Sequence, residues 1–185
     1  MKDNSSFSIS DICEVALFTA LVSVLAQISI PLPGGVPLTM QTMAVLMTGI
    51  VLGSKRGCAA LCAYLLLGAL GVPVFSNFGA GLSRLVGPTG GFLLSYPLMA
   101  WIIGVCAEHG GAKLIPAGLA AATLINYCMG TLMYVFSTGN SIAASLAACV
   151  LPFIGTDILK AALAGWMGFL LKRALSRAGL IRRLD

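Results

Sequence analysis

The sequence predicts an all-α integral membrane protein with six transmembrane helices and both termini in the cytoplasm. Hydrophobic residues make up 58% of the 185-residue chain and charged residues only 9%, whereas a typical soluble domain has about 25% charged residues. The mean hydropathy is +0.99. No polar stretch is long enough to form a second, soluble domain. Residues 1–185 are therefore expected to form a single membrane domain.

Six apolar runs follow one another along the chain, each near the length that crosses about 30 Å of hydrocarbon. The predicted spans are residues 12–31, 38–54, 57–72, 91–107, 114–136 and 152–172. Prolines and glycines break the chain between the first two spans, and again before the fourth. The moderately apolar segment 138–151 is expected to extend the last helix outward or to lie as a short piece at the surface. The first run is too long for the apolar region of a signal peptide, so no cleavable signal is expected.

The basic residues give the predicted orientation. With the N-terminus in the cytoplasm, only Arg84 lies in an outward connection and only Lys160 lies within the membrane. The other Lys and Arg residues, at positions 2, 55, 56, 113, 172, 173, 177, 182 and 183, all fall on the cytoplasmic side. The positive-inside rule therefore predicts two cytoplasmic termini and an even number of spans. Orientation also explains the net charge of +5 better than nucleic-acid binding does, because no aromatic residues interleave the C-terminal basic cluster.

Two opposite charges lie within the last apolar run, at Asp157 and Lys160. A charged side chain at the bilayer centre costs about 2.5–3.5 kcal/mol on translocon scales, so such groups usually face a cavity, a partner or a ligand. Their i, i+3 spacing puts both on one helical face. If the helix begins near Pro152, both lie one to two turns below the outward face. The pair indicates a binding site, and a structural ion pair between packed helices is the alternative.

Further polar residues are expected near the same outward pocket. Arg84 runs against the charge bias of outward loops, which indicates that it is held for an anionic group such as a carboxylate. An ordinary solvated arginine is the alternative. The same loop offers Ser76, Asn77 and Ser83 as hydrogen-bonding groups. Thr39, Gln41 and Thr42 open the second predicted span directly beneath the proline- and glycine-rich connection. Their side chains are therefore expected to face the pocket.

Other kinds of chemistry find little support in the sequence. The six cysteines form no C-x-x-C pair, so neither a metal site nor a disulfide is expected. The only histidine excludes an H-E-x-x-H zinc motif, and there is no phosphate-binding loop for ATP. A solute-binding transporter subunit fits all these features. A self-sufficient carrier driven by a gradient is the second reading, and a membrane enzyme using Lys160 or Asp157 is the third.

Four segments of the chain together resemble a known family. They are Val36-Pro37-Leu38-Thr39-Met40-Gln41-Thr42, then Leu52-Gly53 with Lys55-Arg56-Gly57, then Gly87-Pro88-Thr89-Gly90-Gly91-Phe92-Leu93, and last Asp157-Ile158-Leu159-Lys160. In this order they resemble the BioY family, the biotin-specific S components of energy-coupling factor (ECF) transporters. The resemblance covers nearly the whole chain.

The resemblance implies a six-helix S-component fold in the plasma membrane of a prokaryote. It implies that biotin is captured from the outside and released to the cytoplasm with the help of a transmembrane T component and two ABC ATPases. No enzymatic activity and no resident cofactor are expected. A self-sufficient biotin carrier, or an S component for another small carboxylate-bearing vitamin, is the alternative.

The resemblance also assigns roles to particular residues. Asn77, Arg84, Asp157 and Lys160 carry over as biotin contacts, together with the pocket positions Thr39 and Gln41. The expected division places Asp157 and Asn77 at the ureido ring, and Lys160 and Arg84 at the carboxylate. Ala16 and Ala20 form an A-x-x-x-A face on the first helix, which carries over as the surface that docks the T component. Internal packing is the alternative role for these two alanines.

Overall fold

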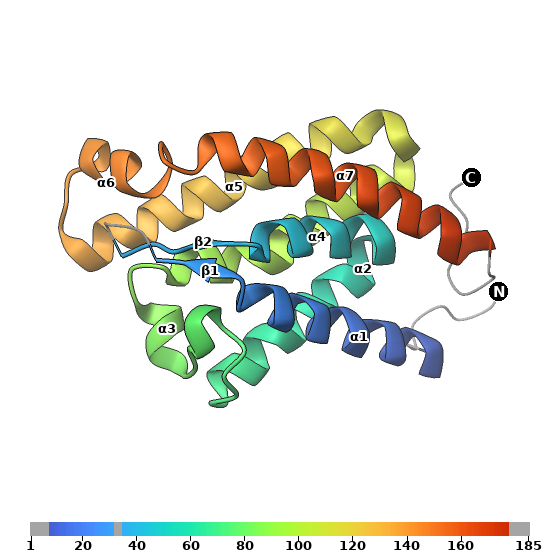
Figure 1. Ribbon diagram of the computed structural model, residues 1–185, viewed down its shortest axis with the longest axis horizontal. Helices are drawn as coiled ribbons and strands as arrows, with labels where there is room; N and C mark the ends of the chain where they lie inside the picture. Colours follow the sequence, from blue (N-terminus) through green and yellow to red (C-terminus); the bar gives the residue numbers. More distant parts are fainter. Residues whose placement is uncertain (1–7, 32–34, 178–185) are drawn as a thin grey trace.

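The computed structural model describes residues 8–31 and 35–177. The chain folds mainly into helices, and five of them are long (Figure 1). These are α1 (Ile9–Ala26), α2 (Gln41–Ala69), α4 (Gly90–His109), α5 (Gly111–Thr138) and α7 (Ile154–Arg177). Within the described ranges, these five are long and apolar enough to cross a membrane. The helical membrane class predicted from composition is therefore confirmed, but the count of six spans is not.

The difference in count comes from α2, which contains the second and third predicted spans. Gly53 interrupts this helix with φ 82° and ψ −175°. A Cβ placed on Gly57 would lie 3.2 Å from the Cα of Gly49, although eight residues of straight helix cover about 12 Å. The chain therefore reverses at Gly53, and α2 is a hairpin of two helical arms, residues 41–52 and 54–69 (Figure 1). Each arm is shorter than the roughly 20 residues of a typical transmembrane helix.

A carboxylate from α4 holds the tip of this hairpin. The backbone N–H of Ser54 donates to Glu108 Oε1 at 2.7 Å, and the Ser54 hydroxyl donates to Oε2 at 2.8 Å. The first N–H groups of a helix lack intrahelical acceptors, so Glu108 caps the second arm. A Cβ on Gly53 would collide with Glu108 Oε1. Gly53 thus meets two requirements, an extended positive-φ backbone and close approach of the cap.

The core lies between α2 and α4. Met99, Ala100 and Ile103 of α4 are fully buried, as are Ile50 and Leu61 of α2. Helix α5 covers the other side of α4, while α1 and α7 pack on α2. The helices therefore form one bundle whose outer apolar side chains are free to face lipid.

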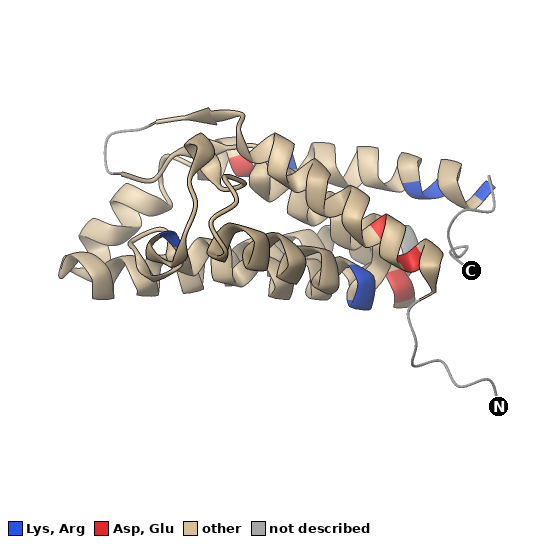
Figure 2. Ribbon diagram, turned by 90° about the horizontal axis from the view of Figure 1, so that it is seen from below, with Lys and Arg blue, Asp and Glu red and all other residues tan. Residues whose placement is uncertain are grey.

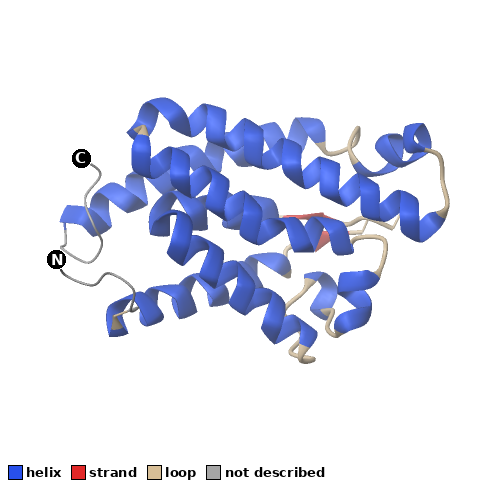
Figure 3. Ribbon diagram, turned by 180° about the vertical axis from the view of Figure 1, so that it is seen from behind, coloured by secondary structure: helices blue, strands red, loops and turns tan. Residues whose placement is uncertain are grey.

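Short elements gather at one end of the bundle (Figures 1 and 3). They are the antiparallel strands β1 (Ser29–Ile30) and β2 (Leu38–Thr39), the 3-10 helix η1 (Ser76–Phe78), α3 (Leu82–Val86) and α6 (Ile142–Cys149). Helix α1 ends at Ala26, five residues before the predicted end of the first span, and the strand pair follows it. Helix α6 is separate from α7, so segment 138–151 forms a short piece of its own and not an extension of the last helix.

Helix α1 begins and α7 ends at the opposite end of the bundle (Figure 1). Lys, Arg, Asp and Glu residues gather mainly at that end (Figure 2). There, Arg56 bridges α2 to α1 through Asp11 Oδ1 at 3.0 Å and Glu14 Oε2 at 2.6 Å. Other residues used to predict the orientation lie outside the described residues, namely Lys2, Arg182, Arg183 and the 32–34 part of the first outward connection.

We predict that Gly53→Ala lowers the free energy of unfolding by about 2 kcal/mol, because backbone in this region of φ and ψ is costly for any residue with a Cβ and the Glu108 cap must move. Thermal unfolding of the protein in detergent measures the change. Gly155→Ala is the matched control, since a Cβ on Gly155 of α7 meets nothing within 4 Å. Equal midpoints for the two variants would contradict the role given to Gly53.

Candidate binding site

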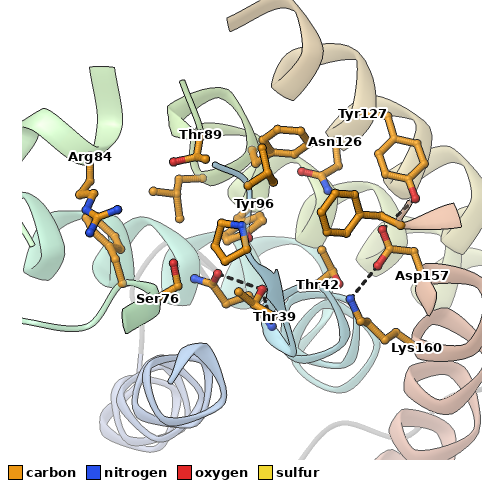
Figure 4. A pocket seen from close by; sticks show the side chains of 17 residues that line it. Thr39, Thr42, Ser76, Arg84, Thr89, Tyr96, Asn126, Tyr127, Asp157 and Lys160 are labelled. Carbon is orange, nitrogen blue, oxygen red and sulfur yellow. Dashed lines mark hydrogen bonds and ion pairs between the residues drawn. The ribbon is translucent and has the colours of Figure 1, made fainter. Parts of the chain in front are cut away.

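A pocket opens among the short elements and the adjoining ends of the long helices. It contains about 630 Å³ of space, its open mouth included. Its walls come from β2, α2, η1, α3, α4, α5 and α7 (Figure 4). The lining residues are Val36, Pro37, Thr39, Gln41, Thr42, Phe75, Ser76, Arg84, Thr89, Phe92, Leu93, Tyr96, Asn126, Tyr127, Phe153, Asp157 and Lys160.

The charged pair predicted from the sequence forms one end of this pocket. Lys160 Nζ donates to Asp157 Oδ1 at 2.8 Å, and the Tyr127 hydroxyl of α5 donates to Oδ2 at 2.8 Å. Only 8% of Asp157 and 7% of Lys160 is exposed. Each carboxylate oxygen therefore has a donor, which offsets the cost of burying the charge. Because both residues line the pocket, the pair can also present its polar atoms to a ligand.

Thr39 and Gln41 lie in the pocket wall as predicted, and both are hydrogen-bonded within the protein. The Thr39 hydroxyl donates to Gln41 Oε1 at 3.1 Å, and Gln41 Nε2 donates to the Tyr64 hydroxyl at 2.6 Å. The Tyr64 hydroxyl donates in turn to the Val74 carbonyl at 3.1 Å. This chain ties the start of α2 to the segment before η1. It fixes the orientation of the Gln41 amide at the pocket surface.

Arg84 lies at the other end of the pocket, on α3 (Figure 4). Its side chain is exposed and packs over Gly79. No carboxylate among the described residues lies within ion-pair distance of its guanidinium. Arg84 and Lys160 are therefore on opposite sides of the pocket, an arrangement that does not fit the expectation that both serve one carboxylate.

The remaining predicted positions lie away from these two ends. Asn77 does not line the pocket and has φ 55° within η1, although its neighbour Ser76 does line it. Ala16 and Ala20 are exposed on α1, outside the pocket. The described cysteines are all free, and no group of three potential ligands in the described ranges is placed to hold a metal ion.

Several polar lining residues were not predicted. On α5, Asn126 is 2% exposed and accepts from the Ser95 hydroxyl at 2.7 Å through Oδ1. Its amide nitrogen has no partner among the described residues and can donate into the pocket. Thr42, by contrast, was expected to face the pocket from the start of the second span. It lines the pocket, and its Oγ1 is buried without a partner among the described residues. The sequence held one signal for the α5 wall of the pocket. Asn126 and Tyr127 are adjacent polar residues in a mainly apolar span, and polar groups inside a membrane often mark a functional site.

Comparisons with known proteins point to one family. The model of the BioY family matches residues 1–177. The chain is 40% identical over 162 residues to a biotin transporter BioY of Thermotoga maritima, covering 86% of this chain and 94% of that one. It is 42% identical over 150 residues to a probable biotin transporter BioY of Pyrococcus horikoshii, covering 81% and 88%. The fold is similar to the crystal structure of the S component for biotin from an ECF-type ABC transporter, with a TM-score of 0.83 and 23% identity over 91% of this chain and 95% of that one.

We predict that Lys160→Met lowers the free energy of unfolding by about 3 kcal/mol, because it leaves the buried Asp157 carboxylate without its counter-charge. Adding Asp157→Asn to the same chain should restore most of that stability, since no unpaired charge then remains. Unfolding of the ligand-free protein in detergent measures both variants. If the double variant were as unstable as Lys160→Met, the ion pair would not account for the loss.

Proposed function

This chain belongs to the BioY family, and we propose that it captures biotin from outside the cell as the substrate-specific S component of an ECF-type ABC transporter. The observation that carries the proposal is the pocket, with a buried acid–lysine pair at one end and an unpaired arginine at the other. The names of the relatives and the fold of the biotin S component support the same conclusion. Binding is the activity of this chain, and no reaction is assigned to it.

The pocket matches the chemistry of biotin from end to end. A ureido group has two N–H donors and one carbonyl acceptor, which complement the Asp157 carboxylate and the Lys160 ammonium. The valerate carboxylate matches the Arg84 guanidinium, which forms no ion pair with the acidic residues that the structure describes. We therefore assign both members of the buried pair to the ureido ring and Arg84 to the carboxylate. Asn77 remains a predicted contact, in the segment beside Ser76.

Aromatic side chains in the pocket wall suit the apolar middle of the ligand. Phe75, Phe92, Tyr96 and Phe153 line the pocket. Their rings offer large apolar surfaces to the sulfur-containing ring and the methylene chain of biotin. Apolar walls with a few convergent polar groups are typical of small-molecule sites.

The proposed orientation places the pocket on the outside and the ends of α1 and α7 in the cytoplasm. In this arrangement the two arms of α2 cross as two spans, which gives six. The bias of Lys and Arg toward one end supports it, as does the location of the start of α1 and the end of α7 at that same end. The membrane is the plasma membrane of a prokaryote.

Coupling to ATP is proposed to occur through partners. Ala16 and Ala20 leave a smooth strip on the exposed side of α1, where another helix can approach closely. We assign this strip to the T component, which would connect the chain to two ABC ATPases.

We predict that Asp157→Ala and Lys160→Ala each weaken biotin binding by about 2 kcal/mol or more, roughly 30-fold, because a charge-assisted hydrogen bond is lost and its partner is left unpaired. Arg84→Ala should cost less, since its exposed charge is screened by water and salt. Calorimetry in detergent measures all three, with Arg173→Ala, an exposed position on α7 far along the helix, as control. Unchanged affinity in both helix variants would make the pair structural.

The orientation predicts that a cysteine at Leu82 reacts with a membrane-impermeant maleimide from outside, whereas one at Lys55 does not. Both positions are exposed in the structure, so accessibility of the side chain is matched. The measurement uses intact cells and a variant without its native cysteines. The reverse labelling pattern would invert the proposed topology.

For the docking strip, we predict that replacing both Ala16 and Ala20 with Trp abolishes pull-down of the T component and ATP-driven uptake, because close approach needs small side chains. Biotin binding by the isolated chain should survive, since the strip lies outside the pocket. Leu17→Trp, on a neighbouring face of α1, is the control and should assemble normally. Loss of biotin binding together with assembly would mean that the alanines maintain the fold.

A further inference from the structure

A second cavity adjoins the pocket at its arginine end. We name it the outer chamber and define it by Ser83, Arg84, Thr89, Tyr134 and Thr138, together with Gly35, Gly87 and Pro88. It contains about 590 Å³ of space, its opening included. Arg84 and Thr89 line both cavities. The two cavities therefore meet at a shared arginine and threonine.

The lining of the outer chamber carries hydroxyl groups among a larger apolar surface. The hydroxyl groups come from α3, from α5 and from Thr89 just before α4. Among the described residues that line it, none carries a negative charge and none is a large aliphatic side chain. Ser83 and Thr138 are exposed, so the chamber also communicates with solvent. Such a space suits a short chain with an apolar stem and a polar, hydrated end.

The positions of the charged groups in the pocket determine which end of the ligand faces the outer chamber. The buried pair on α7 lies on the far side, and Arg84 lies at the junction (Figure 4). A ligand whose ureido ring contacts the pair therefore extends its carboxyl end toward Arg84. Beyond that carboxyl group the structure offers an opening.

Resting on the proposed function, we propose that the site also binds biotin derivatives whose carboxyl group is joined through an amide to a short chain that ends in polar groups. The amide carbonyl takes the place of the carboxylate as an acceptor for Arg84, and the added chain lies in the outer chamber. The ureido contacts are unchanged, because they are at the opposite end. The proposed ligands thus differ from biotin only at the carboxyl end.

The test compares biotin, biotin amide and biotinyl-lysine by calorimetry on the detergent-solubilised protein. Biotin amide has lost the negative charge of biotin and carries no extension. The ratio of the biotinyl-lysine and biotin amide dissociation constants therefore measures the cost of adding the extension, which consists of four methylenes and a terminal ammonium and carboxylate of zero net charge. We expect a ratio below tenfold. A ratio above tenfold would overturn the inference, because it would mean that a wall blocks the chain.

Variants then locate the extension. Ser83→Trp places a bulky ring in the outer chamber and should raise the ratio at least tenfold. Leu82→Trp is the matched control, because Leu82 is the preceding residue of α3, is exposed and does not line the chamber; its ratio should stay at the wild-type value. Thr138→Trp narrows the chamber from α5 and should reproduce the effect if Ser83→Trp fails to fold. An unchanged ratio in a folded Trp variant at either position would contradict the assignment.

The same titrations separate this inference from the proposed function. If the wild-type protein binds biotin but rejects biotinyl-lysine relative to biotin amide, only the outer chamber is wrongly assigned. If the wild-type protein does not bind biotin, the proposed function fails, and this inference fails with it.

Discussion

Burial of opposite charges in a membrane helix is the constraint around which the pocket is organised. Each charge alone would cost several kcal/mol at the bilayer centre. In this protein the Lys160 ammonium and the Tyr127 hydroxyl satisfy the two oxygens of Asp157. A pair satisfied in this way can remain buried without a ligand. It still faces a cavity where a ligand with both donors and acceptors can add to the network.

The pocket keeps its shape because rigid elements hold its walls. The break at Gly53 turns α2 back on itself, and Glu108 caps the second arm from α4. At the other end of the hairpin, Gln41 and Tyr64 join the two arms by a hydrogen bond of 2.6 Å. Tyr64 also holds the backbone at Val74, just before η1. The arms of α2 therefore connect the hairpin tip at Gly53 to the pocket wall at Gln41. The hairpin thus supports the pocket as well as providing two spans.

The sequence allowed some site residues to be predicted and left others hidden, for physical reasons. Three site residues were predictable from their charge. Asp157 and Lys160 are charged residues within an apolar run. Arg84 is a basic residue in an outward loop, where basic residues are rare. Tyr127 was not, because an aromatic residue in an apolar helix is equally suited to lipid, core or pocket until the helix is oriented. Asn77 was suggested both by its place in the outward loop and by the family resemblance. Its positive φ in η1 depends on loop packing that local propensity does not determine. The connection between the second and third spans was predicted at residues 55–56, close to the observed reversal. Gly53 was not identified as its cause, because a glycine in a helical pattern does not by itself reveal its φ.

The central claim is that the buried pair on α7 recognises the ureido ring of biotin while Arg84 meets the carboxylate. An experimental structure of the biotin-bound protein tests it most directly. We expect ureido N–H and carbonyl groups within hydrogen-bonding distance of Asp157 and Lys160, with the valerate directed toward Arg84 and the junction with the outer chamber. A ligand bound in the opposite direction, with its carboxylate on Lys160, would contradict the account.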